Sequence, residues 1–203
     1  MKLLPRLVLL AALAPAAYSQ AVLYSLDGDK QAGEFGSSVS GVGDLNGDGY
    51  DDFVVGAEFG DYVRVFSGQN GSILYQFNGD AWSSRFGASV SGAGDVNGDG
   101  VPDIIVGDPW SSKKGSSYGA AWVFSGLDGS VLHTFYGQAT EDNFGASVSG
   151  AGDVNGDGFD DLIVGAKNFV MPTNPSYARV YSGRDGSILY HFDGDTTATL
   201  ASR

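Results

Sequence analysis

Short apolar runs, separated by turns rich in glycine and acidic residues, dominate the chain. Continuous apolar runs occur at 53–55, 104–106 and 162–164, the pattern of a strand that is buried on both faces. Each is followed by two more runs suited to strands, at 62–67 and 73–77, at 120–125 and 131–135, and at 178–182 and 188–192. A segment rich in Gly, Ser and Ala precedes each set. No stretch has the period of a helix, so the sequence predicts an all-β protein.

The four predicted strands form a unit that occurs three times. The segments that begin at Phe35, Phe86 and Phe144 are nearly identical, and they are spaced by 51 and then 58 residues. The last two strands of each unit are separated by Asn70-Gly71, Asp128-Gly129 or Asp185-Gly186, dipeptides that favour two-residue type I′ turns. A four-stranded meander repeated in this way is typical of a β-propeller blade. We therefore expect three blades of four antiparallel strands, at about 35–77, 86–135 and 144–192.

An acidic nine-residue loop joins the first two predicted strands of each blade. Oxygen-bearing side chains recur at loop positions 1, 3, 5 and 9, as Asp, Asn, Asp and Asp. A hard cation such as Ca²⁺ takes about six to eight oxygen ligands, which a short loop can supply by curling around the ion. Glycine at position 6 permits the positive φ angle that such a curl needs. Position 7 varies, as expected if only its backbone carbonyl is used.

These positions define three predicted calcium sites. Their ligands are Asp44, Asn46, Asp48, Tyr50 (carbonyl) and Asp52; Asp95, Asn97, Asp99, Val101 (carbonyl) and Asp103; and Asp153, Asn155, Asp157, Phe159 (carbonyl) and Asp161. An EF-hand is excluded, because valine stands at position 12 of each copy, where that motif needs glutamate. The alternative is a tight turn without metal. Such a turn accounts for the glycines and asparagines, but not for aspartate at positions 1 and 9 in all three copies.

The pattern Phe-Gly…Gly-Asp-x-Asn-Gly-Asp-Gly-x-x-Asp…Gly-Ala resembles the FG-GAP repeat of integrin α-subunit propellers and their bacterial relatives. The resemblance implies a β-propeller in which the loop between strands A and B of each blade holds Ca²⁺. It also implies that ligands bind on the opposite face. The chain departs from the family pattern after the second strand, where Gly-Ala-Pro is replaced by Gly56-Ala57-Glu58, Gly107-Asp108-Pro109 and Gly165-Ala166-Lys167.

Residues 1–19 have the pattern of a secretory signal peptide. Lys2 and Arg6 form a charged region, residues 7–13 an apolar core, and Ala17-Tyr18-Ser19 a cleavage site. The apolar core is shorter than the ~20 residues that span a bilayer, so we expect no membrane insertion. Residues 20–203 are then secreted, to the extracellular space or the cell envelope. Because the sequence has no cysteine, packing and metal binding must stabilise this exported part.

The strongly negative charge of the chain limits its partners. The formal net charge is −13 at pH 7, and loss of Lys2 and Arg6 with the signal peptide makes it −15. Such a charge argues against nucleic acid or an anionic membrane surface as the partner. An extracellular protein or a glycan is the expected ligand.

Variable loops indicate where that ligand would bind. In a meander, alternate loops emerge on opposite faces, so the acidic A–B loops and the C–D turns share one face, while the B–C and D–A loops share the other. The second set varies in length and carries Trp82, Trp110, Tyr118, Tyr136, Phe169 and Tyr177. Variable aromatic loops on a rigid scaffold suit ligand binding. Alternatively, these aromatic residues only cover the blade tops.

The sequence contains no constellation typical of catalysis. His133 and His191 fall at neighbouring, non-equivalent positions of the last strands, where we expect rim residues. Residues 115–119 match Gly-x-Ser-x-Gly, but lack the strand–turn–helix context of that motif. The preferred function is a secreted, calcium-binding, non-catalytic module for adhesion to protein or glycan. The alternative is a non-catalytic fragment of a secreted polysaccharide lyase or hydrolase whose active residues lie outside this chain.

The arrangement of repeats predicts a partial or open propeller. Residues 22–29 match 73–80 and 188–195, which predicts a lone leading strand D before three complete blades. Three blades fall below the usual four to eight. We consider two hypotheses for this arc. Either the chain is an incomplete gene product, or open arcs associate with one another through their exposed blade faces.

Overall fold

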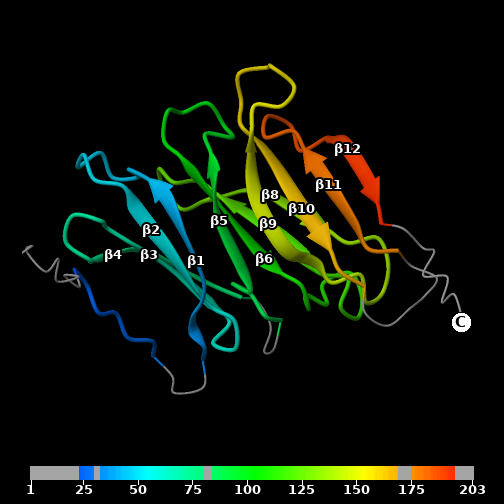
Figure 1. Ribbon diagram of the computed structural model, residues 1–203, viewed down its shortest axis with the longest axis horizontal. Coiled ribbons are helices and arrows are strands. Elements are labelled where there is room, and N and C mark those ends of the chain that lie inside the picture. The colour runs from blue at the N-terminus through cyan, green and yellow to red at the C-terminus, as the bar shows by residue number, and fades with distance from the viewer. Residues whose placement is uncertain (1–22, 30–32, 80–83, 169–174, 195–203) are drawn as a thin grey trace, which may run out of the picture.

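The computed structural model describes residues 23–29, 33–79, 84–168 and 175–194, and within them it contains β-strands but no helix. The strands are β1 (Phe35–Gly43), β2 (Asp52–Ala57), β3 (Tyr62–Phe66), β4 (Ile73–Asn78), β5 (Ser89–Gly94), β6 (Asp103–Asp108), β7 (Ala120–Phe124), β8 (Val131–Tyr136), β9 (Phe144–Gly152), β10 (Asp161–Ala166), β11 (Tyr177–Tyr181) and β12 (Ile188–Asp193). They form three four-stranded antiparallel sheets, each a meander in chain order: blade 1 (β1–β4), blade 2 (β5–β8) and blade 3 (β9–β12). The sheets lie side by side in an open fan, which confirms the predicted all-β, open arrangement (Figure 1).

The apolar runs form the second strand of each blade, as predicted. All six residues of β6 are buried, and β2 and β10 are buried over most of their length. These strands lie inside their sheets, so both of their edges pair with a neighbour and both faces pack against side chains. None of the described residues forms a helix long and apolar enough to cross a membrane. The predicted signal peptide, residues 1–19, lies outside the described residues.

The turn between the last two strands differs from the prediction. In blade 1 the Ser67 amide donates to the Ser72 carbonyl and the Gly71 amide donates to the Ser67 carbonyl, both at 2.8 Å. Gly71 has a φ of 72°, whereas Asn70 does not have a positive φ. The prediction of a two-residue type I′ turn is therefore wrong, because that turn needs positive φ at both central residues. The same longer connection, with a ladder irregularity beside it, recurs in blades 2 and 3.

The leading segment also differs from the prediction. Residues 23–29 lie beside blade 1 but form no strand. The Tyr24 hydroxyl donates to the carbonyls of Gly68 and Gln69, at 3.1 and 2.8 Å, and Asp29 forms an ion pair with Arg64. The predicted lone strand D is thus present as an extended segment held by side chains.

The hydrophobic core lies between the blades rather than within each sheet. One cluster joins blades 1 and 2 and a second joins blades 2 and 3. At each junction the last strand of one blade stacks an aromatic ring on the third strand of the next. The ring centres are 4.0 Å apart for Phe77 and Phe124, and 4.1 Å apart for Phe135 and Tyr181. Phe86 and Phe144, which begin the repeated Phe-Gly segments, are buried against these pairs, edge to face.

Glycine in the second strand allows the blades to approach this closely. A Cβ atom added at Gly56 would lie 2.2 Å from the carbonyl oxygen of Gly87, and one added at Gly107 would lie 2.0 Å from that of Gly145. Both contacts cross a blade junction and both meet backbone, which cannot rotate away. The equivalent glycine of blade 3, Gly165, faces no further blade, and its Cβ would meet nothing closer than 3.6 Å.

We predict that Gly107→Ala destabilises the protein and that Gly165→Ala does not. The first change forces a methyl group into the backbone of blade 3, and such overpacking costs about 1–3 kcal/mol. The second should change the free energy of unfolding by less than about 0.5 kcal/mol. Urea denaturation of both variants provides the measurement. Equal stability of the two variants would show that the blades are not packed as described.

Candidate cation loops and a cation–aromatic surface

The acidic loops join the first two strands of each blade, as the sequence predicts. They all emerge at one face, because the loop of each blade is tied to the C–D turn of the same blade. Two glycines in each loop have positive φ: 72° and 87° for Gly47 and Gly49 in blade 1, with values within a few degrees in the other two blades. The expected curl of the loop is therefore present in all three copies.

The aspartate at position 1 organises each loop. Asp44 Oδ1 accepts the amides of Gly47 and Asp48, at 2.8 and 3.1 Å, and Oδ2 accepts that of Gly49 at 2.8 Å. Asp95 and Asp153 accept the equivalent three amides. These backbone amides, with that of Gly158 contributing most, hold the pKa of Asp153 below its ordinary value. The loop backbone thus stabilises a charged carboxylate at position 1.

The side chains at positions 3 and 5 make shorter local turns. The Asn46 side-chain oxygen accepts the amide of Asp48 at 2.9 Å, and Asp48 Oδ1 accepts that of Tyr50 at 3.0 Å. Both bonds recur in the other loops. In blade 2 the Asn97 amide group also donates to Asp99 at 2.9 Å. Positions 1, 3 and 5 are consequently gathered around one short loop.

The aspartate at position 9 has a role that the sequence did not indicate. Asp52 is buried, and its two oxygens accept the amides of Leu45 and Gly68, both at 2.9 Å. Asp103 and Asp161 make the same pair of bonds in their own blades. Burial raises the pKa of Asp103 to about 6, against the opposing effect of these amides. This aspartate clamps the acidic loop to the C–D turn of the same blade.

The loops match a hard cation in donor chemistry. Each offers carboxylate and amide oxygens at positions 1, 3 and 5, together with backbone carbonyls, which are ligands that Ca²⁺ prefers. In the described part of the chain, however, no three His, Cys, Asp or Glu side chains converge as a metal-binding group. The carboxylates instead accept backbone amides, and each carboxylate oxygen keeps a further lone pair. The donor set therefore fits a cation, and the predicted ligands at positions 1, 3, 5, 7 and 9 remain a prediction.

The opposite face carries cations stacked on aromatic rings. The Arg85 guanidinium lies 3.6 Å from the centre of the Trp110 ring and 5.1 Å from that of Phe59, and it pairs with Glu58 at 2.6 Å. Trp110 and Phe59 are exposed. Further along, Lys113 lies over Trp122 and Lys114 over Tyr136, at 4.3 and 4.8 Å. We call Phe59, Arg85 and Trp110 the Arg85 cluster.

The predicted aromatic ligand residues divide into three groups. Trp110, Tyr118 and Tyr136 lie on this face with at least part of their surface accessible. Tyr177 does not, because it begins β11, is buried, and donates its hydroxyl to Asp142 at 2.9 Å. Burial and this bond raise its pKa, so the residue is structural. Trp82 and Phe169 lie outside the described residues. Phe59 and Arg85 were missed because no motif marks them.

These features place the chain among known proteins. The FG-GAP repeat family matches residues 35–75, 86–124 and 144–187. Integrin alpha-5 of Xenopus laevis is 32% identical over 76% of the chain, and integrin alpha-V of Gallus gallus is 33% identical over 82%. The chain belongs to the FG-GAP repeat family.

The relatives are much longer than this FG-GAP chain. The matched region spans 16% of the length of each of these two integrin subunits. Among solved structures, the chain resembles the crystal structure of Saccharomyces cerevisiae Sqt1, with a TM-score of 0.51, 13% identity, and coverage of 79% of this chain and 36% of that one. At that identity the likeness concerns the fold alone.

The two histidines lie on the last strands of their blades, at the rim, as expected. His133 Nε2 lies 2.6 Å from the Gly183 carbonyl of the next blade, which is the place that the Tyr75 hydroxyl takes one junction earlier. His191 lies between Arg179 and Asp193. The Gly-x-Ser-x-Gly match at residues 115–119 lies in the connection between β6 and β7, not between a strand and a helix.

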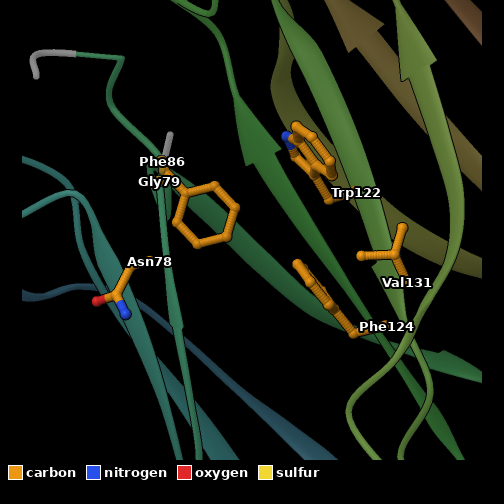
Figure 2. A pocket seen from close by; sticks show the side chains of 6 residues that line it. All are labelled: Asn78, Gly79, Phe86, Trp122, Phe124 and Val131. Atoms are coloured by element: carbon orange, nitrogen blue, oxygen red, sulfur yellow. The ribbon is translucent and has the colours of Figure 1, made fainter. Parts of the chain in front are cut away.

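A small pocket lies at the rim between blades 1 and 2. Its volume is about 120 Å³, and it is lined by Asn78, Gly79, Phe86, Trp122, Phe124 and Val131. In Figure 2 the aromatic rings border this space, while the Asn78 amide points away from it. The pocket is therefore mainly apolar. It is lined partly by Trp122, whose place in the other blades is taken by arginine.

The loop geometry separates two roles for aspartate. We predict that Asp161→Asn destabilises the chain even in a chelator, because one buried amide loses its acceptor at a cost of about 1–3 kcal/mol. Asp157→Asn, at the exposed position 5 of the same loop, should cost less than about 0.5 kcal/mol under those conditions. Thermal unfolding in EDTA provides the measurement. Equal losses in both variants would contradict the clamp role of position 9.

Proposed function

We propose that this FG-GAP chain is an exported, calcium-binding β-propeller module that binds an extracellular protein or glycan and has no catalytic activity of its own. The observation that carries the proposal is the threefold acidic loop on one face, opposite a cation–aromatic surface on the other. The resemblance to integrin α propellers supports the same division of roles. The signal-like residues 1–19 support export to the extracellular space or cell envelope.

Calcium binding is supported by the donor set and by the curl of the loops. The proposed ligands are the side chains at positions 1, 3, 5 and 9 and the carbonyl at position 7 of each loop. The ion would supply positive charge where each loop gathers four or three aspartates. The chain's own amides already hold Asp44, Asp95 and Asp153 toward their loops.

Ligand binding is supported by the Arg85 cluster. Exposed aromatic rings and arginine are the side chains that carry most binding energy at protein interfaces. The Trp110 amide donates to the Ser84 carbonyl at 2.9 Å, and the Arg85 amide donates to Asp61 at 3.0 Å, so the backbone beneath both side chains is held. Such a rigid surface loses little entropy when a ligand binds.

Calcium should raise the melting temperature of the chain. At a concentration about tenfold above Kd, each site contributes roughly 1.4 kcal/mol, and extracellular calcium modules have Kd values of about 10⁻⁴–10⁻³ M. Three independent sites then raise Tm by roughly 10 °C. Scanning calorimetry in calcium and in EDTA, with Mg²⁺ as the control ion, measures this shift. An unchanged Tm, with no heat of binding in a calcium titration, would reject the calcium sites.

Substitutions in the Arg85 cluster should weaken ligand binding without unfolding the chain. The probes are immobilised arrays of glycans and of extracellular matrix proteins, with calcium present. Trp110→Ala should lower binding to any positive spot by at least about tenfold, as expected for an aromatic anchor. Leu127→Ala, an exposed apolar change at a C–D turn on the other face, is the matched control. Equal loss in both variants, or none in either, would contradict this ligand surface.

A further inference from the structure

The two ends of the fan expose residues that are buried at the junctions between blades. On the outer side of blade 3, Tyr190 is 50% and Phe192 54% exposed. One junction earlier, the residue equivalent to Phe192 is Phe135, which is 8% exposed because it stacks on Tyr181. Val154 at the same end is exposed, whereas its equivalents Leu45 and Val96 are buried. Blade 3 thus exposes the side chains that the preceding blade contributes to a junction. We call this surface the donor half of a junction.

Blade 1 exposes the surface that the following blade contributes to a junction, which we call the acceptor half. Val39 is 66% exposed, whereas the equivalent Val90 and Val148 are each 6% exposed beneath the preceding blade. Gly36 has a φ of 93°, within a few degrees of Gly87 and Gly145, the two residues whose carbonyls receive the glycine of the preceding blade. The acceptor backbone is therefore already in the conformation that a junction uses.

The outer part of this acceptor is covered by residues 23–29. The Tyr24 hydroxyl donates to the Gly68 and Gln69 carbonyls in the same way that the Tyr75 hydroxyl of blade 1 donates to the Gly126 and Leu127 carbonyls of blade 2. Its ring also lies against Gly71, as that of Tyr75 lies against Gly129. Residues 23–29, which we call the cap segment, hence imitate the last strand of a preceding blade.

We propose that a second copy of this chain docks head to tail, with β12 of one copy displacing the cap segment from blade 1 of the other. Tyr190 takes the place of Tyr24, and Phe192 enters the aromatic stack of blade 1. Because donor and acceptor are different surfaces, the contact is heterologous.

The loop face adds a polar contact to the same junction. Asp160 of blade 3 accepts the Asp95 amide of blade 2 at 2.9 Å, and so ties two acidic loops together. Asp51 is the equivalent residue of blade 1, and it is exposed in the arc. In the docked pair it reaches the Asp153 amide of the other copy. The inference depends on blade packing alone, and not on calcium or on a ligand.

The cap segment makes the association tunable. Tyr24→Ala with Asp29→Ala removes the hydroxyl bonds and the Arg64 ion pair that hold the cap. Without these contacts the cap segment competes less well for blade 1, so this cap variant should associate at roughly tenfold lower concentration than the unchanged chain. Sedimentation velocity over a concentration series, in a fixed calcium concentration, measures the shift. Leu127→Ala is the control and should leave the association unchanged.

Gly165→Ala provides the decisive variant. It is tolerated in the isolated arc, but at the two existing junctions the equivalent Cβ meets a carbonyl oxygen at 2.0–2.2 Å. In the cap variant it should therefore abolish association while leaving the melting curve intact. Val39→Lys should do the same from the acceptor side. The Gly165→Ala variant keeps an intact acceptor half, and the Val39→Lys variant keeps an intact donor half. A mixture of the two should therefore form dimers through these two intact surfaces.

Two outcomes would overturn the proposal. The first is a folded cap variant that stays monomeric at the highest concentration reached. The second is an association that persists after Gly165→Ala or Val39→Lys, because it would use surfaces other than the two end faces.

Discussion

Contact between neighbouring blades is the constraint on which the rest of this structure depends. Each sheet is only four strands wide, and its apolar residues pack against the next sheet rather than against a layer of their own. Gly56 and Gly107 bring the backbones together, and the stacked aromatic rings fill the wider rim. A fold that gains its core between repeats leaves a half-junction at each end of the described arc, and residues 23–29 cover part of the one at blade 1.

The same constraint explains why the acidic loops are so uniform. Position 9 ties the loop to the C–D turn of its own blade, and position 1 collects the amides of the loop. Both functions need a carboxylate whether or not a cation is present. Aspartate therefore recurs at positions 1 and 9 partly because its oxygens accept backbone amides, a role that the spacing of the residues does not indicate. Cation binding and loop architecture are compatible roles of one motif, since a carboxylate oxygen that accepts one amide keeps a further lone pair.

Much of the fold could be predicted from the sequence, because each blade repeats the same signals. Strands β2, β6 and β10 follow from continuous apolar runs, and the blade order follows from the recurring Phe-Gly segments. The C–D turn was mispredicted because Asn-Gly fits two turn types, and the choice depends on ladder geometry. The clamp role of Asp52 and the stacking of Arg85 on Trp110 depend on contacts between distant residues, which no local pattern encodes.

Differences between the blades are concentrated away from the acidic loops. Blade 2 has Asp108 where the other blades have Ala57 and Ala166, and this aspartate is buried at the end of β6 next to the variable loops. Burial raises its pKa to about 6, and one of its oxygens has no hydrogen-bond partner. A buried charge of this kind costs stability near neutral pH, since the folded state holds the proton more tightly than the unfolded chain does. The chain carries this cost on the face of the Arg85 cluster, which is where a ligand surface would differ from the repeating scaffold.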